Sequence, residues 1–500
     1  MTTVTITEAP LAIEDLLAVV DGARVELDDG TRARIAASRQ VVDQALIAGD
    51  AVYGLTTQVG HGKDTRLTEE QIRTEQHFLV MSHSGGIGPP LPTAIVRAAL
   101  AVRLNGIARG GSGAGVAVAE TLAALLNARV HPVVPETASV GAADIGQMAG
   151  MAQVAIGEGR AEYRGELLPG GEALRRAGIA PLVLGGKDGL ALISANGVSV
   201  GQAALVVARA EVTAEGADVA AALSMEATGA NTSVLRPAVG RAKPIPGQIA
   251  AADHLRELLT GSPLLEPGAA RSVQDALSFR VVPQVHGALR EYVTAARSAV
   301  TTELNAAADN PLVALADQTL VSNGNFQPVV LAIACDALRI AVAQVGLLSE
   351  HRLSHLWDAF FQQLTGGPPP MPLYGLQLRY PAAAVFSELR QLAGPATLDT
   401  PPLDLGVEDH GTGAPLSVRK TDTALGLLED LLAVELLLAR DVLATARARP
   451  ELGAGTGAAL TTVEKAIAAA DPYADAAHRA LRDRFPGRPA AGRRTTPPGP

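Results

Sequence analysis

The segment Leu425-Gly426-Leu427-Leu428-Glu429-Asp430-Leu431-Leu432-Ala433-Val434-Glu435-Leu436-Leu437 decides the fold class of this chain. Its leucines and its valine leave little polar surface on any side of a helix. Such a helix is stable in water only when other elements cover most of its sides. The segment, which lies within a helical stretch over residues 421–448, therefore predicts a long core helix inside a helical bundle.

Further helical stretches surround this core helix in the sequence. Apolar residues recur at helical spacing over residues 93–109 and 116–128, and long stretches cover residues 201–227, 272–308 and 326–356. Only 3% of the residues are aromatic, and much of the apolar content is alanine and leucine, which are strong helix formers. The composition predicts a mostly all-α chain. A helix of about 30 residues spans about 45 Å, which favours burial against partner subunits.

The region over residues 132–201 differs from the rest because glycine and proline interrupt it, so we expect short strands and loops there. Two capping boxes, Thr68-Glu69-Glu70-Gln71 and Thr461-Thr462-Val463-Glu464, predict helix starts. The expected organisation is a mixed N-terminal domain over residues 1–205, a long-helix bundle over residues 206–483 and a disordered Pro-, Gly- and Arg-rich tail over residues 484–500.

Charge and cysteine content argue against several classes of protein. The formal net charge of −10 argues against a nucleic-acid partner, which requires a basic face. The single cysteine, Cys335, cannot form an intrachain disulfide. The most apolar long stretch, over residues 328–348, contains Asp336 and Arg339, so we expect a buried helix and no membrane partner. The N-terminal residues lack a basic start followed by a long apolar run, so we expect no signal peptide and a cytoplasmic protein.

Several short motifs follow one another along the chain, and each is weak alone. The order is Val52-Tyr53-Gly54-Leu55-Thr56-Thr57, Ser82-His83, Asn105-Gly106-Ile107-Ala108-Arg109-Gly110, His131-Pro132-Val133-Val134-Pro135, Arg280-Val281-Val282-Pro283-Gln284-Val285-His286-Gly287, Glu303-Leu304-Asn305, Asp309-Asn310-Pro311-Leu312, Gly324-Asn325-Phe326 and Glu408-Asp409-His410. In this order the set resembles the aromatic amino acid ammonia-lyase family, which includes the histidine, phenylalanine and tyrosine ammonia-lyases and related aminomutases. The resemblance covers residues 53–448.

The resemblance implies a fold and an assembly. Members of the family are long-helix bundles with a smaller N-terminal domain, and they form homotetramers whose active sites draw loops from several subunits. A homotetramer that acts on a small-molecule substrate is therefore expected here. The over-long apolar helices agree with this expectation.

The segment Ala138-Ser139-Val140-Gly141-Ala142-Ala143-Asp144-Ile145 lies where the family builds its electrophile. That electrophile is methylidene-imidazolone, which forms when an Ala-Ser-Gly triplet cyclises and its serine loses water. Here Ala142-Ala143-Asp144 replace the pattern Ala-Ser-Gly-Asp, so the serine position holds alanine and one residue is missing. Alanine has no hydroxyl to eliminate, and Ser139 precedes Val140, whose branched side chain makes ring closure unfavourable. We expect that the cofactor does not form.

Three further positions depart from the family pattern. Leu277 replaces a tyrosine that usually precedes the arginine at 280, and Gln327-Pro328 replace the usual His-Gly after Phe326. The usual Leu-Ile-Asn-Gly-Thr appears as Leu192-Ile193-Ser194-Ala195-Asn196-Gly197-Val198. Asn196 therefore matches the family's asparagine only after a shift in register.

The remaining matches define the expected site. By the resemblance, Tyr53 is the catalytic base, a phenol whose acidity must be raised to take a proton near neutral pH. Arg280 grips the substrate carboxylate with its forked guanidinium. His83 binds the substrate ring, and Glu408 resembles the acidic residue opposite it in histidine-type members. The polar residues expected to line the substrate site are Asn196, Gln284 and Asn310.

Each of these residues also has a structural interpretation. A tyrosine in a core loop is usually structural, Arg280 could pair with a core carboxylate, and His83 could be a satisfied core histidine. Glu408-Asp409-His410 could form a hydrogen-bonded network. We expect no metal, because no second pair of histidine and carboxylate has ligand spacing.

The sequence leaves three functions open. Without methylidene-imidazolone, Tyr53 must act on a substrate that is already activated. This predicts a cofactor-free lyase or cyclase for a modified amino acid or specialised metabolite that Arg280 can hold. One alternative is a true histidine- or tyrosine-type ammonia-lyase in which some other cyclisation occurs, and another is a non-catalytic homologue that binds a ligand.

Overall fold

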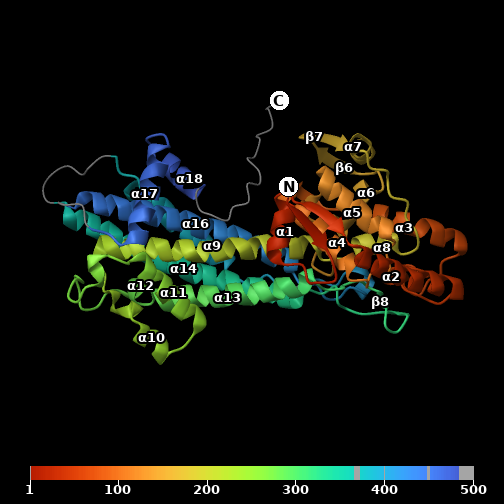
Figure 1. Ribbon diagram of the computed structural model, residues 1–500, viewed down its shortest axis with the longest axis horizontal. Coiled ribbons are helices and arrows are strands. Elements are labelled where there is room, and N and C mark those ends of the chain that lie inside the picture. Colours follow the sequence, from red (N-terminus) through yellow and green to blue (C-terminus); the bar gives the residue numbers. More distant parts are fainter. Residues whose placement is uncertain (1, 365–371, 399, 447–450, 484–500) are drawn as a thin grey trace.

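The computed structural model of the protein describes residues 2–364, 372–398, 400–446 and 451–483. Four long helices form its body and lie side by side along the long axis of the molecule (Figure 1). These helices are α9 (Gly197–Thr228), α13 (Val282–Leu304), α14 (Val329–Gln363) and α16 (Ala414–Thr445). Shorter helices pack around one end of this bundle: α10 (Pro237–Ala242), α11 (Pro246–Leu258), α12 (Leu277–Arg280), α17 (Ala454–Ala468) and α18 (Ala474–Arg482). One more short helix, α15 (Arg379–Leu392), packs along α14 and α16.

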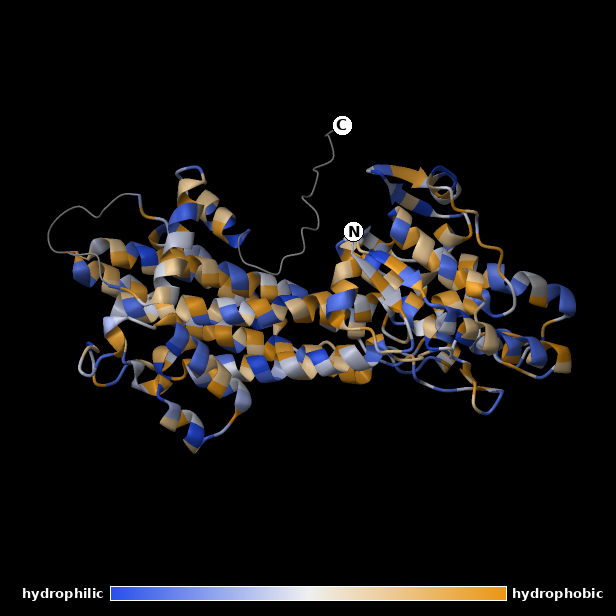
Figure 2. Cartoon of the chain, in the orientation of Figure 1, coloured by the Kyte–Doolittle hydropathy of each residue, from blue (hydrophilic) through white to orange (hydrophobic). Residues whose placement is uncertain are grey.

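The core helix predicted from its leucines is α16. It packs against α14 and α9, and Leu425, Leu431 and Leu437 are fully buried. Hydrophobic residues recur along all the bundle helices (Figure 2). Burial of these apolar faces against one another is the main favourable contribution to the stability of the bundle.

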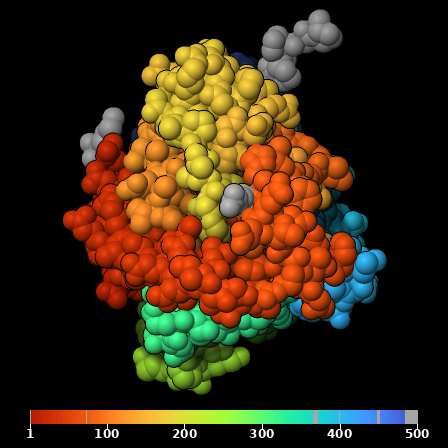
Figure 3. Space-filling view, turned by 90° about the vertical axis from the view of Figure 1, so that its right-hand side faces the viewer, coloured from red at the N-terminus to blue at the C-terminus, as the bar shows by residue number. Residues whose placement is uncertain are grey.

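The N-terminal part of the chain covers the other end of the bundle (Figure 1), where its segments (red to yellow) form most of the surface (Figure 3). α4 packs against α9 at a point where Gly201 allows close approach, because a Cβ there would lie 2.9 Å from the backbone of Ala98. The helices of this part are α1 (Ile13–Val20), α2 (Asp29–Ala48), α3 (Glu69–His83), α4 (Thr93–Ala108), α5 (Val116–Ala128), α6 (Ile145–Ala155), α7 (Gly170–Ala177) and α8 (Asp188–Ile193).

The strands form small separate sheets. Parallel pairing joins β1 (Thr3–Ile6) to β2 (Arg24–Leu27), and antiparallel pairing joins β3 (Ile87–Pro90) to β5 (Pro135–Thr137). A three-stranded antiparallel sheet has the order β4-β6-β7, with β4 at Val130–Pro132, β6 at Arg160–Tyr163 and β7 at Glu166–Pro169. The last pair is the hairpin of β8 (Leu312–Ala314) and β9 (Thr319–Val321). The short strands predicted for residues 132–201 are thus present.

Most predicted helices are confirmed, with two differences. The stretch over residues 272–308 divides into α12 and α13, and α9 runs without interruption through the domain boundary predicted at residue 205.

The capping box at Thr68 is present, since its side chain accepts a hydrogen bond from the Gln71 backbone and the Gln71 side chain accepts one from the Thr68 backbone. The capping box predicted at Thr461 is wrong. That residue lies inside α17, where its hydroxyl donates to the Gly457 carbonyl. The tail predicted to be disordered, residues 484–500, lies outside the described residues.

Within the described residues, two helical segments are long and apolar enough to cross a membrane by length and composition alone. They are Asp188–Thr228 and Val329–Gln363, and their most apolar windows are 94% and 56% buried inside the protein. The core helix of a helical bundle has the same composition, because its neighbours cover it.

Candidate active site

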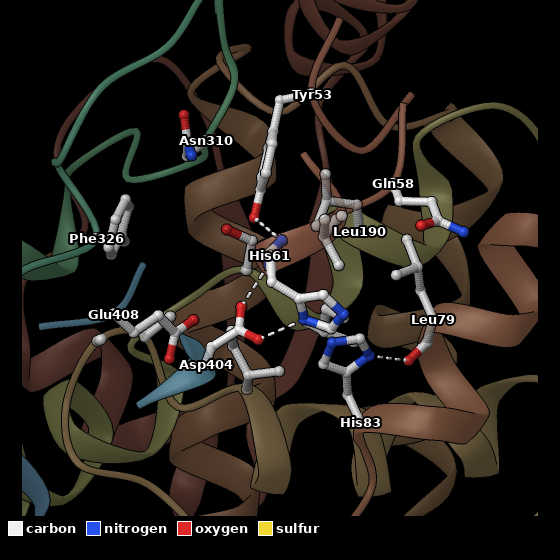
Figure 4. Close-up of a pocket in the computed structure, with 18 of the residues that line it drawn as sticks. Tyr53, Gln58, His61, Leu79, His83, Leu190, Asn310, Phe326, Asp404 and Glu408 are labelled. Atoms are coloured by element: carbon white, nitrogen blue, oxygen red, sulfur yellow. Dashed lines mark hydrogen bonds and ion pairs between the residues drawn. The ribbon is translucent and has the colours of Figure 1, made fainter. Parts of the chain in front are cut away.

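A cavity of about 500 Å³ lies at the N-terminal end of the molecule. Tyr53, His61, Asp404 and Glu408 point toward it from loops, and His83 reaches it from α3 (Figure 4). The other lining residues are Gln58, Val59, Gly60, Gly62, Glu75, Phe78, Leu79, Ala142, Ala143, Ile145, Leu190, Ile193, Ser194, Asn310 and Phe326.

One wall of the cavity is a single face of α3. Glu75, Leu79 and His83 are four residues apart, so they lie above one another on the helix. His83 Nδ1 donates to the Leu79 carbonyl at 2.9 Å, which leaves its Nε2 free to meet a ligand. Burial raises the pKa of Glu75, although the positive charge of His83 opposes this. His83 is therefore half-buried beside the cavity and only one of its ring nitrogens is satisfied.

Tyr53 lies in a tight turn whose shape depends on glycine. Its hydroxyl oxygen accepts a hydrogen bond from the Gly60 amide at 2.9 Å. Gly60 has a φ of 58°, and a Cβ there would lie 2.1 Å from a carboxylate oxygen of Asp404. Burial raises the pKa of Tyr53 above its ordinary value; the Gly60 amide opposes this, and the negative charges of Glu408 and Asp404 add to it.

The altered loop forms a turn closed by its own serine. Ser139 Oγ donates to the Ala143 carbonyl at 2.8 Å and accepts from the Gly141 amide at 2.9 Å. Ala143 has a φ of 57°, the left-handed region that non-glycine residues rarely adopt. The side chains that this turn offers to the cavity are the methyl groups of Ala142 and Ala143.

Hydrogen bonds fix this loop to the segments that precede three bundle helices. The Ala143 amide donates to the Phe326 carbonyl before α14, and the Asp144 amide donates to the Ala195 carbonyl before α9. The Val140 carbonyl accepts from the Gly413 amide before α16. The loop therefore lies where the N-terminal ends of these helices converge, and their partial positive charges favour negative charge in the cavity.

Asp144 and Asn196 support the loop from behind. The Asp144 carboxylate accepts from the Ser199 amide at 2.7 Å and from the Ser199 hydroxyl at 2.9 Å. Its burial raises the pKa to about 6, against the effect of the Ser199 hydrogen bonds. Asn196 Nδ2 donates to the Phe326 carbonyl at 2.9 Å, while Asn196 Oδ1 is buried without a partner in the described structure.

Methylidene-imidazolone does not fit this loop. Its alkene requires a serine at the turn, and both side chains there end in a methyl group. Ser139 uses its hydroxyl to hold the turn closed, and Val140 follows it. The amide of Asp144, which follows Ala143, already donates to Ala195.

A second loop carries Asp404 and Glu408 into the cavity. Reciprocal backbone hydrogen bonds pair Leu403 with Glu408, and the turn between them brings Asp404 against His61. Burial raises the pKa of Glu408, the charge of Asp404 adds to this, and the charge of His83 opposes it. Asp409 and His410 are exposed and do not line the cavity. In residues 2–364, 372–398, 400–446 and 451–483, no cluster of His, Cys, Asp or Glu is suited to hold a metal.

Arg280 and Gln284 lie elsewhere in the chain. They belong to α12 and α13 at the opposite end of the bundle from α3 (Figure 1). No carboxylate of the described residues pairs with the Arg280 guanidinium, so the expected alternative of a core ion pair is not seen. Gln284 Oε1 is buried without a partner in the same described part. A single chain thus brings Tyr53, His83, Asn310 and Glu408 together, but not Arg280 and Gln284.

His61, Asp404 and Glu75 also line the cavity, although their sequence motifs did not predict it. His61 lies in a Gly-His-Gly turn shortly after Tyr53, which is a usable signal because glycines surround it. Asp404 offers no such signal, because its contact with His61 joins residues 343 positions apart. Glu75 could have been found from its helical spacing of eight residues before His83.

Known proteins match this chain in sequence over most of its length. The family model for aromatic amino acid lyase matches residues 11–465. The histidine ammonia-lyase of Caldanaerobacter subterraneus subsp. tengcongensis is 36% identical over 441 residues, which cover 87% of this chain and 86% of the relative.

Two solved structures share the whole architecture. The ergothioneine-degrading enzyme ergothionase from Treponema denticola matches with a TM-score of 0.90 and 27% identity, over 97% of this chain and 98% of that chain. The histidine ammonia-lyase from Trypanosoma cruzi matches with a TM-score of 0.86 and 30% identity, over 97% and 93% of the two chains. The fold, the cavity and these relatives together show that this chain belongs to the aromatic amino acid lyase family.

Proposed function

We propose that this chain is a lyase that eliminates an amine from a histidine-derived substrate without methylidene-imidazolone. The observation that carries the proposal is the turn at Ala142 and Ala143, which offers only methyl groups to the cavity where the family pattern has a serine. The substrate must then contain its own leaving group, because nothing in the loop can activate a primary amine.

The cavity and the relatives support a histidine-derived substrate. Glu408 and the free Nε2 of His83 can exchange hydrogen bonds with the two nitrogens of an imidazole ring. Relatives at 36% identity are named histidine ammonia-lyase, and ergothionase shares the fold. Ergothioneine is a histidine-derived betaine whose amino nitrogen is fully methylated. Such a nitrogen already carries a positive charge and leaves as a neutral tertiary amine, so it needs no electrophile.

The reaction balances without a cofactor. A base takes the proton from Cβ of the substrate, and the C–H electron pair forms the new double bond. The Cα–N bond breaks, and its electron pair leaves with the nitrogen as trimethylamine. Tyr53 is the proposed base, and a guanidinium that holds the substrate carboxylate would complete the site.

The second candidate is a true histidine ammonia-lyase. The names of the curated relatives favour it over a cyclase, since those at 36% identity are histidine ammonia-lyases. It requires that a modified electrophile forms from residues other than a serine at position 143. The third possibility, a non-catalytic homologue, is disfavoured because Tyr53, His83 and Glu408 still face one cavity.

Intact mass and turnover together test the proposal. We expect the purified protein to have the mass of its unmodified sequence, whereas cyclisation and dehydration would remove two waters, about 36 Da. We expect release of trimethylamine from the trimethyl betaine of histidine or its 2-thio derivative, and no release of ammonia from L-histidine. An unmodified protein that turns over L-histidine, or a mass deficit of two waters, would contradict the proposal.

We also propose that the working unit is a homotetramer. None of the described residues that line the cavity is lysine or arginine, although an amino acid carboxylate requires a cation. Arg280 is available at the far end of the molecule without a partner in the described structure. A second copy that inserts its α12 end at the cavity supplies this cation.

A further inference from the structure

His61 and Asp404 form a histidine–carboxylate pair at the cavity. His61 Nδ1 lies 2.7 Å from Asp404 Oδ1, and the His61 amide donates to Asp404 Oδ2 at 2.8 Å (Figure 4). The carboxylate therefore holds both the ring and the backbone of the histidine. Because Nδ1 donates to Asp404, the other ring nitrogen, Nε2, is free to accept a proton.

The His61 ring connects the cavity to solvent. It lines the same cavity as Tyr53, and 65% of its side chain is exposed, compared with 27% for Asp404. A titratable group that borders the substrate cavity on one side and solvent on the other can carry a proton between them.

The same contact also holds the turn that binds Tyr53. Gly60, whose amide donates to the Tyr53 hydroxyl, directly precedes His61. Asp404 and Leu405 have φ values of 47° and 55°, in the left-handed region that non-glycine residues rarely adopt. Such strain persists only where surrounding contacts offset it. The contacts of Asp404 with His61 are among them, beside the backbone hydrogen bonds that pair Leu403 with Glu408.

We propose that His61 is the proton-relay residue of this site and that Asp404 is its positioning residue. The inference rests on the proposed function in one respect, namely that Tyr53 takes the Cβ proton. After that step, His61 Nε2 accepts the phenolic proton of Tyr53 through water in the cavity and passes it to solvent, which returns Tyr53 to its phenolate. The relay transfers protons only, and no group in it is oxidised or reduced. Asp404 holds the His61 ring through Nδ1, so that Nε2 is the nitrogen that exchanges the proton.

Other titratable groups surround the pair and are part of the test. Tyr53, Glu408 and, on the α3 wall, Glu75 and His83 line the same cavity. Lys63 and Asp64 follow His61 in the chain and pair with each other. The test variants therefore leave these surrounding residues unchanged and alter His61 or Asp404 alone.

The kinetic test compares His61→Ala and Asp404→Asn with the wild type on the betaine substrate. His61→Ala keeps its backbone amide for Asp404, so the turn remains held. We expect kcat to fall by about a hundredfold or less, because a general acid–base group in the chemical step contributes about a hundredfold to ten-thousandfold, whereas the relay only regenerates the base. We expect KM to change less than about threefold, since the relay acts after binding. Added imidazole should restore part of kcat in His61→Ala but not in Asp404→Asn.

His77→Ala is the matched control, since His77 is exposed on α3 and does not line the cavity. It should keep wild-type kcat. The relay is overturned if His61→Ala keeps wild-type kcat, or if its loss does not respond to imidazole while the thermal unfolding midpoint is unchanged.

Alkylation tests the pair without any turnover. Iodoacetate is applied to the intact wild-type protein, and the carboxymethylated ring nitrogen of His61 is identified after hydrolysis of its peptide. We expect alkylation at Nε2 alone in the wild type and at both nitrogens in Asp404→Ala, because Asp404 no longer occupies Nδ1. Equal labelling of both nitrogens in the wild type overturns the pair. If the wild type turns over neither substrate, the proposed function fails, and alkylation still decides whether Asp404 orients His61.

Discussion

At the scale of single residues, the surroundings of Tyr53 favour its neutral phenol. Burial raises its pKa, the Gly60 amide opposes this, and the charges of Glu408 and Asp404 add to it. The phenolate that can take a proton is therefore scarce near neutral pH, and its fraction grows as the pH rises. A guanidinium at the cavity would favour the phenolate. This is a second argument for the proposal that Arg280 of another copy lies at the cavity.

The first prediction concerns Tyr53 as the base. We expect kcat to rise with pH on the alkaline side of neutrality, because only the deprotonated phenol accepts the Cβ proton. Tyr53→Phe should lower kcat by about a hundredfold to ten-thousandfold at every pH, measured as initial rates of amine release. Tyr473→Phe, a substitution at an exposed tyrosine before α18, is the control and should leave kcat unchanged. A Tyr53→Phe enzyme with wild-type kcat would show that another group is the base.

The second prediction concerns the turn at Ala143. Ala143→Ser alone should leave the intact mass at the value of its sequence, because the following amide belongs to Asp144 and already donates to Ala195. Replacement of Ala143 by a Ser-Gly pair supplies both a hydroxyl and an unhindered amide nitrogen. The mass of that protein should be about 36 Da below the value calculated from its sequence. Intact-mass spectrometry of the two proteins checks both results. A mass deficit in the single substitution would mean that the loop cyclises without glycine.

Sequence reasoning found part of the candidate site because part of it is local. Tyr53, His83, Asn310 and Glu408 each lie in a short motif, and the fold places all of them at one cavity. The contact of His61 with Asp404 depends on two loops that only the assembled bundle brings together. No pattern within either loop determines that contact.

At the scale of elements, composition predicted the long helices well because they are buried on most sides. Alanine, valine, leucine and isoleucine make up much of the 32 residues of α9 and the 35 of α14, so their apolar content marks them as core helices. The prediction of a helix start at Thr461 was wrong for a physical reason. A threonine followed by a carboxylate at capping-box spacing also fits a helix interior, where the threonine hydroxyl bonds to the carbonyl four residues earlier.

Two bundle helices and the shorter helix α11 are joined by one buried carboxylate, Asp218 of α9. It accepts hydrogen bonds from His254 of α11 at 2.9 Å and from His286 of α13 at 2.7 Å, and it also pairs with Arg290. Burial alone would raise the pKa of Asp218, but the hydrogen bonds from His254 and His286 and the charge of Arg290 hold it below its ordinary value. The hydrogen bond to Asp218 raises the pKa of His254, although partial burial opposes this.

The third prediction follows from this cluster. Asp218→Ala leaves Arg290 without its buried partner and should lower the free energy of unfolding by about 3–5 kcal/mol. The lowered pKa means that the contribution of Asp218 is complete above its unfolded pKa near ~4 and is lost as the pH falls further. Unfolding by urea at fixed protein concentration, from neutral to acidic pH, measures the difference between the wild type and the variant.

The contribution of His254 to the free energy of unfolding changes with pH in the opposite direction. Its pKa is raised in the folded protein, so its contribution is complete below the unfolded value near ~6.5 and is lost as the pH rises through the folded value. The stability difference between the wild type and His254→Gln should therefore be larger at mildly acidic pH than at alkaline pH. A difference that grows with pH would contradict the proposed pairing of His254 with Asp218.

At the scale of the whole molecule, the proposed homotetramer gives the two ends of each chain complementary halves of one site. The cavity end contributes Tyr53, His83 and the carboxylates of Glu75, Asp404 and Glu408, and the α12 end contributes Arg280. The long bundle separates these two ends, so one chain cannot bring Tyr53 and Arg280 together (Figure 1). A substrate that carries a carboxylate can be bound between Tyr53 and Arg280 only when the two residues come from different copies.

The last prediction tests this division by mixing inactive proteins. Tyr53→Phe and Arg280→Ala homo-oligomers should each be inactive, because every site lacks one of the two groups. When the two variants are co-expressed, the chain that retains Tyr53 can meet a neighbour that retains Arg280. If the copies mix at random, about a quarter of the sites combine both intact residues, so about a quarter of wild-type kcat should return.

The control is to mix the two purified homo-oligomers without co-expression or unfolding, which should restore nothing while the assemblies stay intact. Size-exclusion chromatography of all three samples checks that each has the same assembly size. If both variants are inactive alone and the co-expressed protein is inactive too, while differently tagged chains are shown to share one assembly, then Tyr53 and Arg280 do not meet across copies. Arg280 would then have a structural role at the α12 end, and the cation that binds the substrate carboxylate would have to come from a residue nearer the cavity.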